Sequence, residues 1–278
     1  MKLLITSLFV SMIVLVSLYA QDDIPLGDLA RESRAQTEAL RKSNPNWKSR
    51  TWEENGTQNH TGGWDESIPD PTGAKEMVDR GLALDRQERF DEALSEYTRA
   101  IGVRPNYARA YYDIGVVKGE QGKTAEAIVA YRQAIALDGT HWMPFYNLAT
   151  LLSNLGQYDE AIAEYKRAVA LDDTNWLPLY SLGTVLLKTG HAAEAEDVLR
   201  KALHLSPDSL KTMMNLGNAL GDQRKFEEAI PYFRRILDTA PDWNNARQSL
   251  CYSLLQLGRR DEAARVRAEW PSYRPNQP

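Results

Sequence analysis

The sequence is poor in cysteine and carries no excess of basic residues. Its 278 residues include a single cysteine, Cys251, so the chain can form neither an intramolecular disulfide nor a multi-cysteine zinc site. The 33 basic residues are outnumbered by 38 acidic ones, which gives a formal net charge of -5. This balance excludes a strongly basic nucleic-acid-binding protein. Hydrophobic residues make up 43% and charged residues 26% of the chain, a composition typical of a folded soluble protein.

The sequence also lacks the patterns of common catalytic and metal sites. The four histidines show no HExxH spacing, and no GxSxG nucleophile elbow occurs. Residues 119–124 end like a phosphate-binding loop, but Val117 stands where that loop needs its first glycine. Carboxylate pairs such as Asp159 and Glu160 recur near the starts of predicted helices, where they favour the helix dipole. We therefore predict a noncatalytic protein that has no metal or cofactor.

The first twenty residues predict export. Lys2 precedes an uncharged apolar run, residues 3–20, which ends at Ala20 before Gln21 and two aspartates. These features are the three parts of a signal peptide, and we expect cleavage after Ala20. The length of the run leaves an uncleaved membrane anchor open as the alternative. In either case the rest of the chain is expected to be periplasmic or secreted, or tethered to the outer face of the cytoplasmic membrane.

Residues 21–73 form a predicted linker. They contain four prolines and five glycines, with ten acidic and six basic side chains, and this composition favours extended or partly disordered chain. Three tryptophans, Trp47, Trp52 and Trp64, are unusual in such a segment. We expect them either to dock on the folded domain or on a partner, or to have no fixed role.

A period of 34 residues begins at Ala74 and continues without an insertion. Small residues recur near the middle of the first half of each copy, and apolar residues at helical spacing lie between them. Glycines mark the turn inside a copy and prolines the turn between copies. Each copy is therefore predicted to be two antiparallel helices, whose close approach requires the small residues. The copies start at residues 74, 108, 142, 176, 210 and 244, and the small residues are Gly81, Gly115, Ala149, Gly183, Gly217 and Cys251.

At these positions the sequence resembles the tetratricopeptide repeat (TPR) family, whose unit is a 34-residue helix-turn-helix. The resemblance implies an all-α fold within residues 74–278, a right-handed superhelical solenoid of six repeats. In such a solenoid the first helix of each pair lines a concave surface. The last part of the array departs from the pattern at Ile236, Arg267 and Trp270, and we expect the last helix to act as a terminal cap.

The fifth, sixth and ninth positions of each copy are the predicted binding positions. In the family these positions contact an extended peptide, and asparagine binds the peptide backbone because its amide both donates and accepts. Tyrosine supplies flat contact area at low entropic cost. The same residue types also occur on repeat surfaces that bind no known peptide, so a generic surface is the alternative. Val78 replaces the lysine with which some repeats clamp a C-terminal carboxylate, so we expect no acidic C-terminal tail as ligand. The candidate partner-binding residues are Tyr112, Asp113, Tyr146, Asn147, Thr150, Tyr180, Ser181, Asn215 and Asn218.

These observations predict an exported, noncatalytic scaffold or adaptor that binds a protein or an extended peptide in its concave groove, for cell-envelope assembly. Two alternatives stay open. A glycan or small-molecule binding module is suggested by Trp142, Trp176 and the nearby tyrosines, since sugars stack on such rings. The chain could also be an accessory subunit of a separately encoded enzyme. The repeat region has 26 basic and 28 acidic residues, which argues against a nucleic-acid partner.

Overall fold

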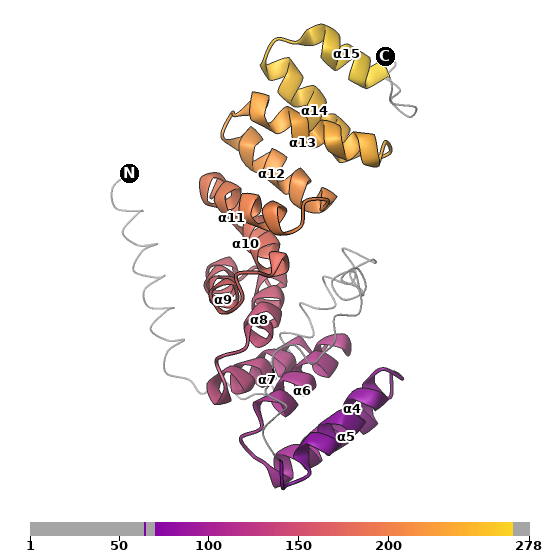
Figure 1. Ribbon diagram of the computed structural model, residues 1–278, viewed down its shortest axis with the longest axis vertical. Coiled ribbons are helices and arrows are strands. Elements are labelled where there is room, and N and C mark those ends of the chain that lie inside the picture. Colours follow the sequence, from indigo (N-terminus) through magenta and orange to yellow (C-terminus); the bar gives the residue numbers. More distant parts are fainter. Residues whose placement is uncertain (1–63, 65–69, 269–278) are drawn as a thin grey trace, which may run out of the picture.

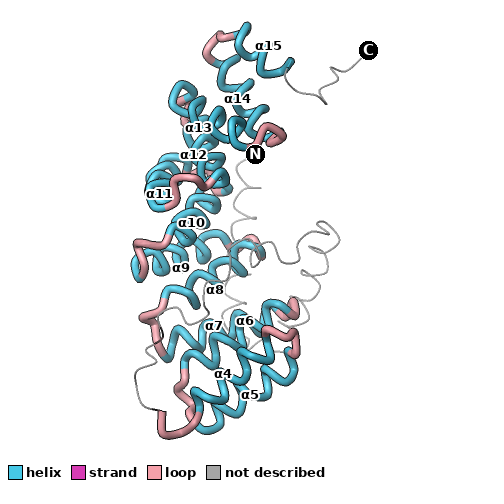
Figure 2. Tube along the Cα trace, turned by 45° about the vertical axis from the view of Figure 1, so that its right-hand side comes forward, coloured by secondary structure: helices cyan, strands magenta, loops and turns pink. Residues whose placement is uncertain are grey.

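The computed structural model describes Trp64 and residues 70–268. This part of the chain contains twelve helices and no strand. The helices form antiparallel pairs that stack along the long axis of the molecule, with α4 and α5 at one end and α14 and α15 at the other (Figure 1). Short turns join successive helices (Figure 2). The prediction of an all-α helical repeat solenoid is confirmed. No helix among the described residues has both the length and the apolar character needed to span a membrane. The predicted signal or anchor lies outside the described residues, as does most of the linker, including Trp47 and Trp52.

The helices follow the period of the sequence, since each first helix begins 34 residues after the one before it. We call the surface formed by the first helices of the six pairs the first-helix surface. The first helices are α4 (Ala74–Asp85), α6 (Ala108–Glu120), α8 (Trp142–Asn154), α10 (Trp176–Lys188), α12 (Leu210–Asp222) and α14 (Asn244–Gln256). The second helices are α5 (Phe90–Val103), α7 (Thr124–Leu137), α9 (Tyr158–Leu171), α11 (Ala192–Leu205), α13 (Phe226–Thr239) and α15 (Arg260–Ala268).

The turn inside each pair needs one residue in the left-handed region. Glycine adopts this conformation at no steric cost, and it fills the position in four of the six pairs. Glu88 in the first pair and Arg224 in the fifth hold the same turn, with φ of 58° and 61°. The glycines are Gly122, Gly156, Gly190 and Gly258, with φ between 72° and 80°.

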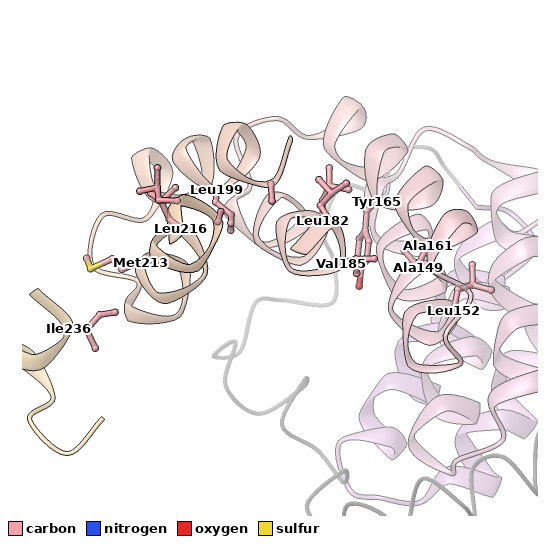
Figure 3. Close-up of a cluster of buried hydrophobic side chains, with 14 of the residues drawn as sticks. Ala149, Leu152, Ala161, Tyr165, Leu182, Val185, Leu199, Met213, Leu216 and Ile236 are labelled. Atoms are coloured by element: carbon pink, nitrogen blue, oxygen red, sulfur yellow. The ribbon is translucent and has the colours of Figure 1, made fainter. Parts of the chain in front are cut away.

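The two helices of a pair approach most closely at the recurring small residues. A Cβ atom on Gly183 would lie 2.5 Å from Leu199 Cγ, and one on Gly217 would lie 2.5 Å from Phe233 Cε1. Large buried side chains thus fill the space that each glycine leaves. Figure 3 shows this packing continuing from Leu152, through Tyr165 and Leu199, to Leu216.

The core is divided into two clusters of buried side chains. The larger cluster extends from Tyr112 in α6 to Ala263 in α15. The smaller one joins the first pair of helices to Ala110 and Val117, which lie on α6. Because α6 contributes to both clusters, it is the boundary between them. The first pair therefore has a core of its own, which it shares only with α6. At the other end Ile236, which departs from the alanine pattern, is fully buried in the larger cluster.

A row of ion pairs joins consecutive second helices from α7 to α15. In each pair, a basic residue late in one second helix contacts a glutamate in the first turn of the next second helix. Thr98 occupies the basic position in α5, so the row starts at α7. The pairs are Arg132 to Glu160 at 2.6 Å, Lys166 to Glu194 at 2.6 Å, Arg200 to Glu228 at 2.9 Å and Arg234 to Glu262 at 2.8 Å.

Besides this row of ion pairs, Glu196 on α11 accepts three hydrogen bonds from side chains. Arg200 Nε donates to one carboxylate oxygen over 2.8 Å, and Gln223 Nε2 and Lys225 Nζ both donate to the other over 2.8 Å. Gln223 and Lys225 belong to the turn after α12, so Glu196 ties the fourth pair to the fifth. Burial disfavours the charged carboxylate and so raises its pKa. The hydrogen bonds from the three donors have the larger combined effect and lower the pKa of Glu196 to about 2.

Candidate functional site

Three of the nine predicted contact residues are buried in the first-helix surface. Tyr112, Asp113 and Asn147 are only 4%, 2% and 5% exposed. Asn147 Nδ2 donates to the Tyr112 hydroxyl over 3.3 Å, which joins α8 to α6. Since this amide serves a partner inside the protein, Asn147 supports the surface from beneath. This differs from the expectation that its amide faces a peptide.

Asp113 takes part in a buried ion pair within α6. Its carboxylate lies 3.7 Å from Nε of Arg109, one turn earlier, and both side chains are almost fully buried. Burial raises the pKa of Asp113 above its ordinary value, while the nearby Arg109 guanidinium opposes this shift. Asp113 therefore serves the interior of α6 and presents no free carboxylate to a ligand.

Four of the remaining predicted residues, together with Thr184, are half-buried and make two groups of hydrogen bonds, one that joins α8 to α9 and one that joins α10 to α12. Thr150 Oγ1 donates to the Tyr146 carbonyl and lies 2.9 Å from the Tyr165 hydroxyl. In the next pair Thr184 Oγ1 donates to the Tyr180 carbonyl over 2.9 Å and accepts from Asn215 Nδ2 over 2.8 Å. The structure thus brings Tyr146, Thr150, Tyr180 and Asn215 into one polar strip across α8, α10 and α12. Ser181, also half-buried, borders this strip on α10, next to Tyr180.

Asn218, the last predicted residue, lines a cavity between α12 and α14. The cavity has a volume of about 670 Å³. The rings of Phe226 and Phe233, 7% and 1% exposed, give it an apolar floor. Its remaining sides are mostly polar. They are formed by Asn218, Asp222, Arg224, Gln248, Ser249, Tyr252, Ser253 and Gln256, together with Gly217 and Gly221.

Sequence reasoning missed Tyr252 and Arg224 in this cavity. Tyr252 is 57% exposed, and its ring meets Phe226 edge-on with centroids 5.9 Å apart. It occupies the ninth position of the last copy, so the positional rule that selected Asn218 could also have selected it. Arg224 holds a left-handed turn that glycine holds in four other pairs. Such a conformation has a steric cost for a residue with a side chain, and here that side chain lines the cavity.

Each of the tryptophans that suggested a glycan site packs against a tyrosine. The ring of Trp142 packs against Tyr146 with centroids 5.8 Å apart, and Trp176 packs against Tyr180 at 5.9 Å. Each tryptophan thus contacts the tyrosine one turn later in its own helix. Within the described part of the chain, no group of three His, Cys, Asp or Glu side chains could hold a metal ion.

Helix pairs stacked in one array, with a polar strip and a cavity on the first-helix surface, define a helical repeat solenoid. Such solenoids bind through extended surfaces. Five tetratricopeptide repeat family models match successive segments of the chain, residues 78–141, 130–163, 151–190, 178–209 and 209–240. The chain belongs to the tetratricopeptide repeat family. A comparison with curated proteins gave no match.

Solved structures of other TPR proteins share the fold. YrrB, a TPR protein reported to have an unusual peptide-binding site, is 23% identical with a TM-score of 0.58, over 63% of this chain and 91% of its own. PilF from Pseudomonas aeruginosa is 20% identical with a TM-score of 0.59, over 71% of this chain and 90% of its own. MamA from Desulfovibrio magneticus is 23% identical with a TM-score of 0.54, over 57% and 90%.

Proposed function

We propose that this protein is a noncatalytic adaptor that binds an extended segment of another protein on its first-helix surface. The cavity between α12 and α14 carries the proposal. Its volume of about 670 Å³ falls within the usual range for ligand sites. The Phe226 and Phe233 rings suit an apolar side chain of the ligand, and the amides of Asn218 and Gln248 suit its backbone, because an amide both donates and accepts.

The charge of the site fits a partner chosen by shape and hydrogen bonding. One acidic and one basic side chain, Asp222 and Arg224, line the cavity, so neither sign predominates. We therefore expect salt to change the affinity little. The peptide-binding site reported for YrrB, which has the same fold, also supports a peptide ligand.

We also propose that the protein is exported and acts in cell-envelope assembly. This part of the proposal rests on the signal-like sequence of residues 1–20. Cleavage would release a periplasmic or secreted domain, whereas an uncleaved segment would tether it through residues 3–20. Amino-terminal sequencing of the protein recovered from cell fractions distinguishes these outcomes, and recovery of the uncleaved chain in the cytoplasm would contradict export.

Selection of peptides from a displayed random library, followed by calorimetry, tests the binding site. For a selected peptide, Tyr252→Ala should lower the affinity at least about tenfold, as expected for an aromatic residue at a binding centre. Asn218→Ala should lower the affinity less, by the free energy of about one hydrogen bond. Leu255→Ala is the matched control, because Leu255 is also exposed on α14 but does not line the cavity. Equal affinities for all three variants would contradict the proposed site.

A further inference from the structure

Trp64 lies against α6 and the start of α8, in the other half of the array from the cavity between α12 and α14. Its ring centroid is 3.9 Å from that of His141 and 6.1 Å from that of Tyr112. The side chain is half-buried and packs on the larger core cluster. A tryptophan from the segment before the first repeat therefore occupies a place between α6 and the start of α8.

The two residues that face Trp64 are held in position by other contacts. His141 Nε2 lies 3.2 Å from Asp138 Oδ2, and Asp138 itself accepts hydrogen bonds from Thr140. The Tyr112 hydroxyl accepts from Asn147 and donates to Met143 Sδ over 3.8 Å. Since none of these contacts involves Trp64, the aromatic walls are preorganised for a ring, which lowers the entropic cost of binding one.

A short tether favours Trp64 of the same chain over a ring from outside. Asp70 fixes the segment just before α4, because its carboxylate accepts from the Thr72 amide and hydroxyl and from the Lys75 amide. Asp70 is six positions after Trp64, so the chain between them reaches at most about 22 Å. A tether this short raises the effective concentration of the ring to the order of millimolar.

The contact is nevertheless incomplete. The Trp64 indole N–H is buried and makes no hydrogen bond with any described residue, whereas buried tryptophans usually satisfy this donor. An unpaired buried donor is costly. A segment that brings a tryptophan and also an acceptor for its N–H can therefore compete with the internal one.

We propose that Tyr112 and His141 form a subsite for a tryptophan side chain, that Trp64 occupies it as an internal ligand, and that a tryptophan-bearing segment of a partner enters by displacing Trp64. The role of a partner in this inference rests on the proposed function. The occupation of the subsite by Trp64 does not.

The first test locates Trp64 in the full-length chain. The protein is labelled with 5-fluorotryptophan, and the fluorine signals of its seven tryptophans are assigned by single Trp→Phe substitutions. His141→Ala should move the Trp64 signal to the value of a free peptide of residues 58–70, and the exposed control His204→Ala should leave it unchanged. A Trp64 signal that already has the free-peptide value in the wild type, or that responds equally to both variants, overturns the inference.

The second test supplies the ring from outside and does not depend on His141→Ala folding. A peptide of residues 58–70 is titrated into the wild-type chain and into Trp64→Ala, and the Trp142 fluorine signal, next to His141, is followed. Trp64→Ala should half-saturate at a peptide concentration at least about tenfold lower than the wild type, because the tethered competitor is gone. The same peptide with Trp64→Ala should give no shift. Equal half-saturation, or no shift in Trp64→Ala at peptide concentrations of about 10 mM, above the tether's effective concentration, overturns the inference.

These outcomes are separable from the proposed function. If the subsite fails but a selected peptide still depends on Tyr252, the cavity between α12 and α14 stands without it. If the subsite holds and no library peptide depends on Tyr252, only the proposed function falls.

Discussion

Gly217 on α12 offers a direct test of how the helix pairs are packed. In Gly217→Ala the new Cβ would lie 2.5 Å from Phe233 Cε1 and 2.6 Å from Cζ, whereas carbon atoms normally pack about 3.5 to 4.0 Å apart. The ring must therefore move by about 1 Å, and Phe233, only 1% exposed, is enclosed by the larger core cluster. Overpacking of this kind costs about 1 to 3 kcal/mol.

Gly221, one turn later in α12, is the matched control. A Cβ on Gly221 meets no atom within 4 Å. Gly221→Ala should therefore gain helix propensity, up to about 1 kcal/mol because Gly221 lies in the last turn. Gly217→Ala gains the same propensity but also pays the packing cost, so it should be less stable than Gly221→Ala by about 1 to 3 kcal/mol.

Urea unfolding followed by circular dichroism measures this difference. We expect the midpoint of Gly221→Ala to lie above that of the wild type and the midpoint of Gly217→Ala to lie clearly below that of Gly221→Ala. Equal midpoints for the two variants would refute the argument that side chains from the second helix require glycine at the crossing.

Three further predictions follow from the ion pairs and from the divided core. Glu196→Gln should destabilise the protein by about 1.5 to 3 kcal/mol at neutral pH, the value of hydrogen bonds to a charged group. The pKa of Glu196 is lowered from its ordinary 4.5 to about 2. The stability difference between the wild type and Glu196→Gln should therefore be complete above pH 4.5 and should vanish as the pH falls through about 2. Melting temperatures that differ equally at both ends of this pH range would contradict this prediction. Lys166→Ala should cost less than about 1 kcal/mol, because its ion pair with Glu194 is exposed, and this cost should disappear in about 1 M salt, whereas a cost independent of salt would show that the side chain acts by packing. Amide hydrogen exchange should be faster in α4 and α5 than in α8 to α13, because the first pair has a separate core and lies outside the row of ion pairs; uniform protection across all the helices would contradict this.

The periodic part of the structure could be predicted from the sequence for a physical reason. Each pair of helices contacts only its neighbours, so the positions of small and apolar residues fix where helices begin and where they cross. Gly183 and Gly217, for example, are required by the crossing of the two helices within a single copy. Such positions repeat, and the repetition makes them visible in the sequence.

The binding surface was less predictable, because it depends on which residues meet between copies. Asn147 is buried and its amide donates a hydrogen bond to Tyr112 of the preceding copy. Asn218, in contrast, lines an open cavity beside α14. Both are asparagines at predicted binding positions. Trp64 has no periodic counterpart, and its partners Tyr112 and His141 lie in the second repeat and just before the third. Nothing in the sequence near Trp64 indicates them.

The row of ion pairs has a genetic consequence. Arg132, Arg200 and Arg234 each contact a glutamate exactly 28 residues further along the chain, and Lys166 occupies the equivalent place in its own helix. Unequal crossing-over between two of these copies would add or remove 34 codons, and the new junction would still bring a basic residue to a glutamate. The number of repeats could thus change in one recombination event, and the new junction would still carry an ion pair. If a crossover places α5 before the new junction, no ion pair forms there, because Thr98 of α5 carries no charge.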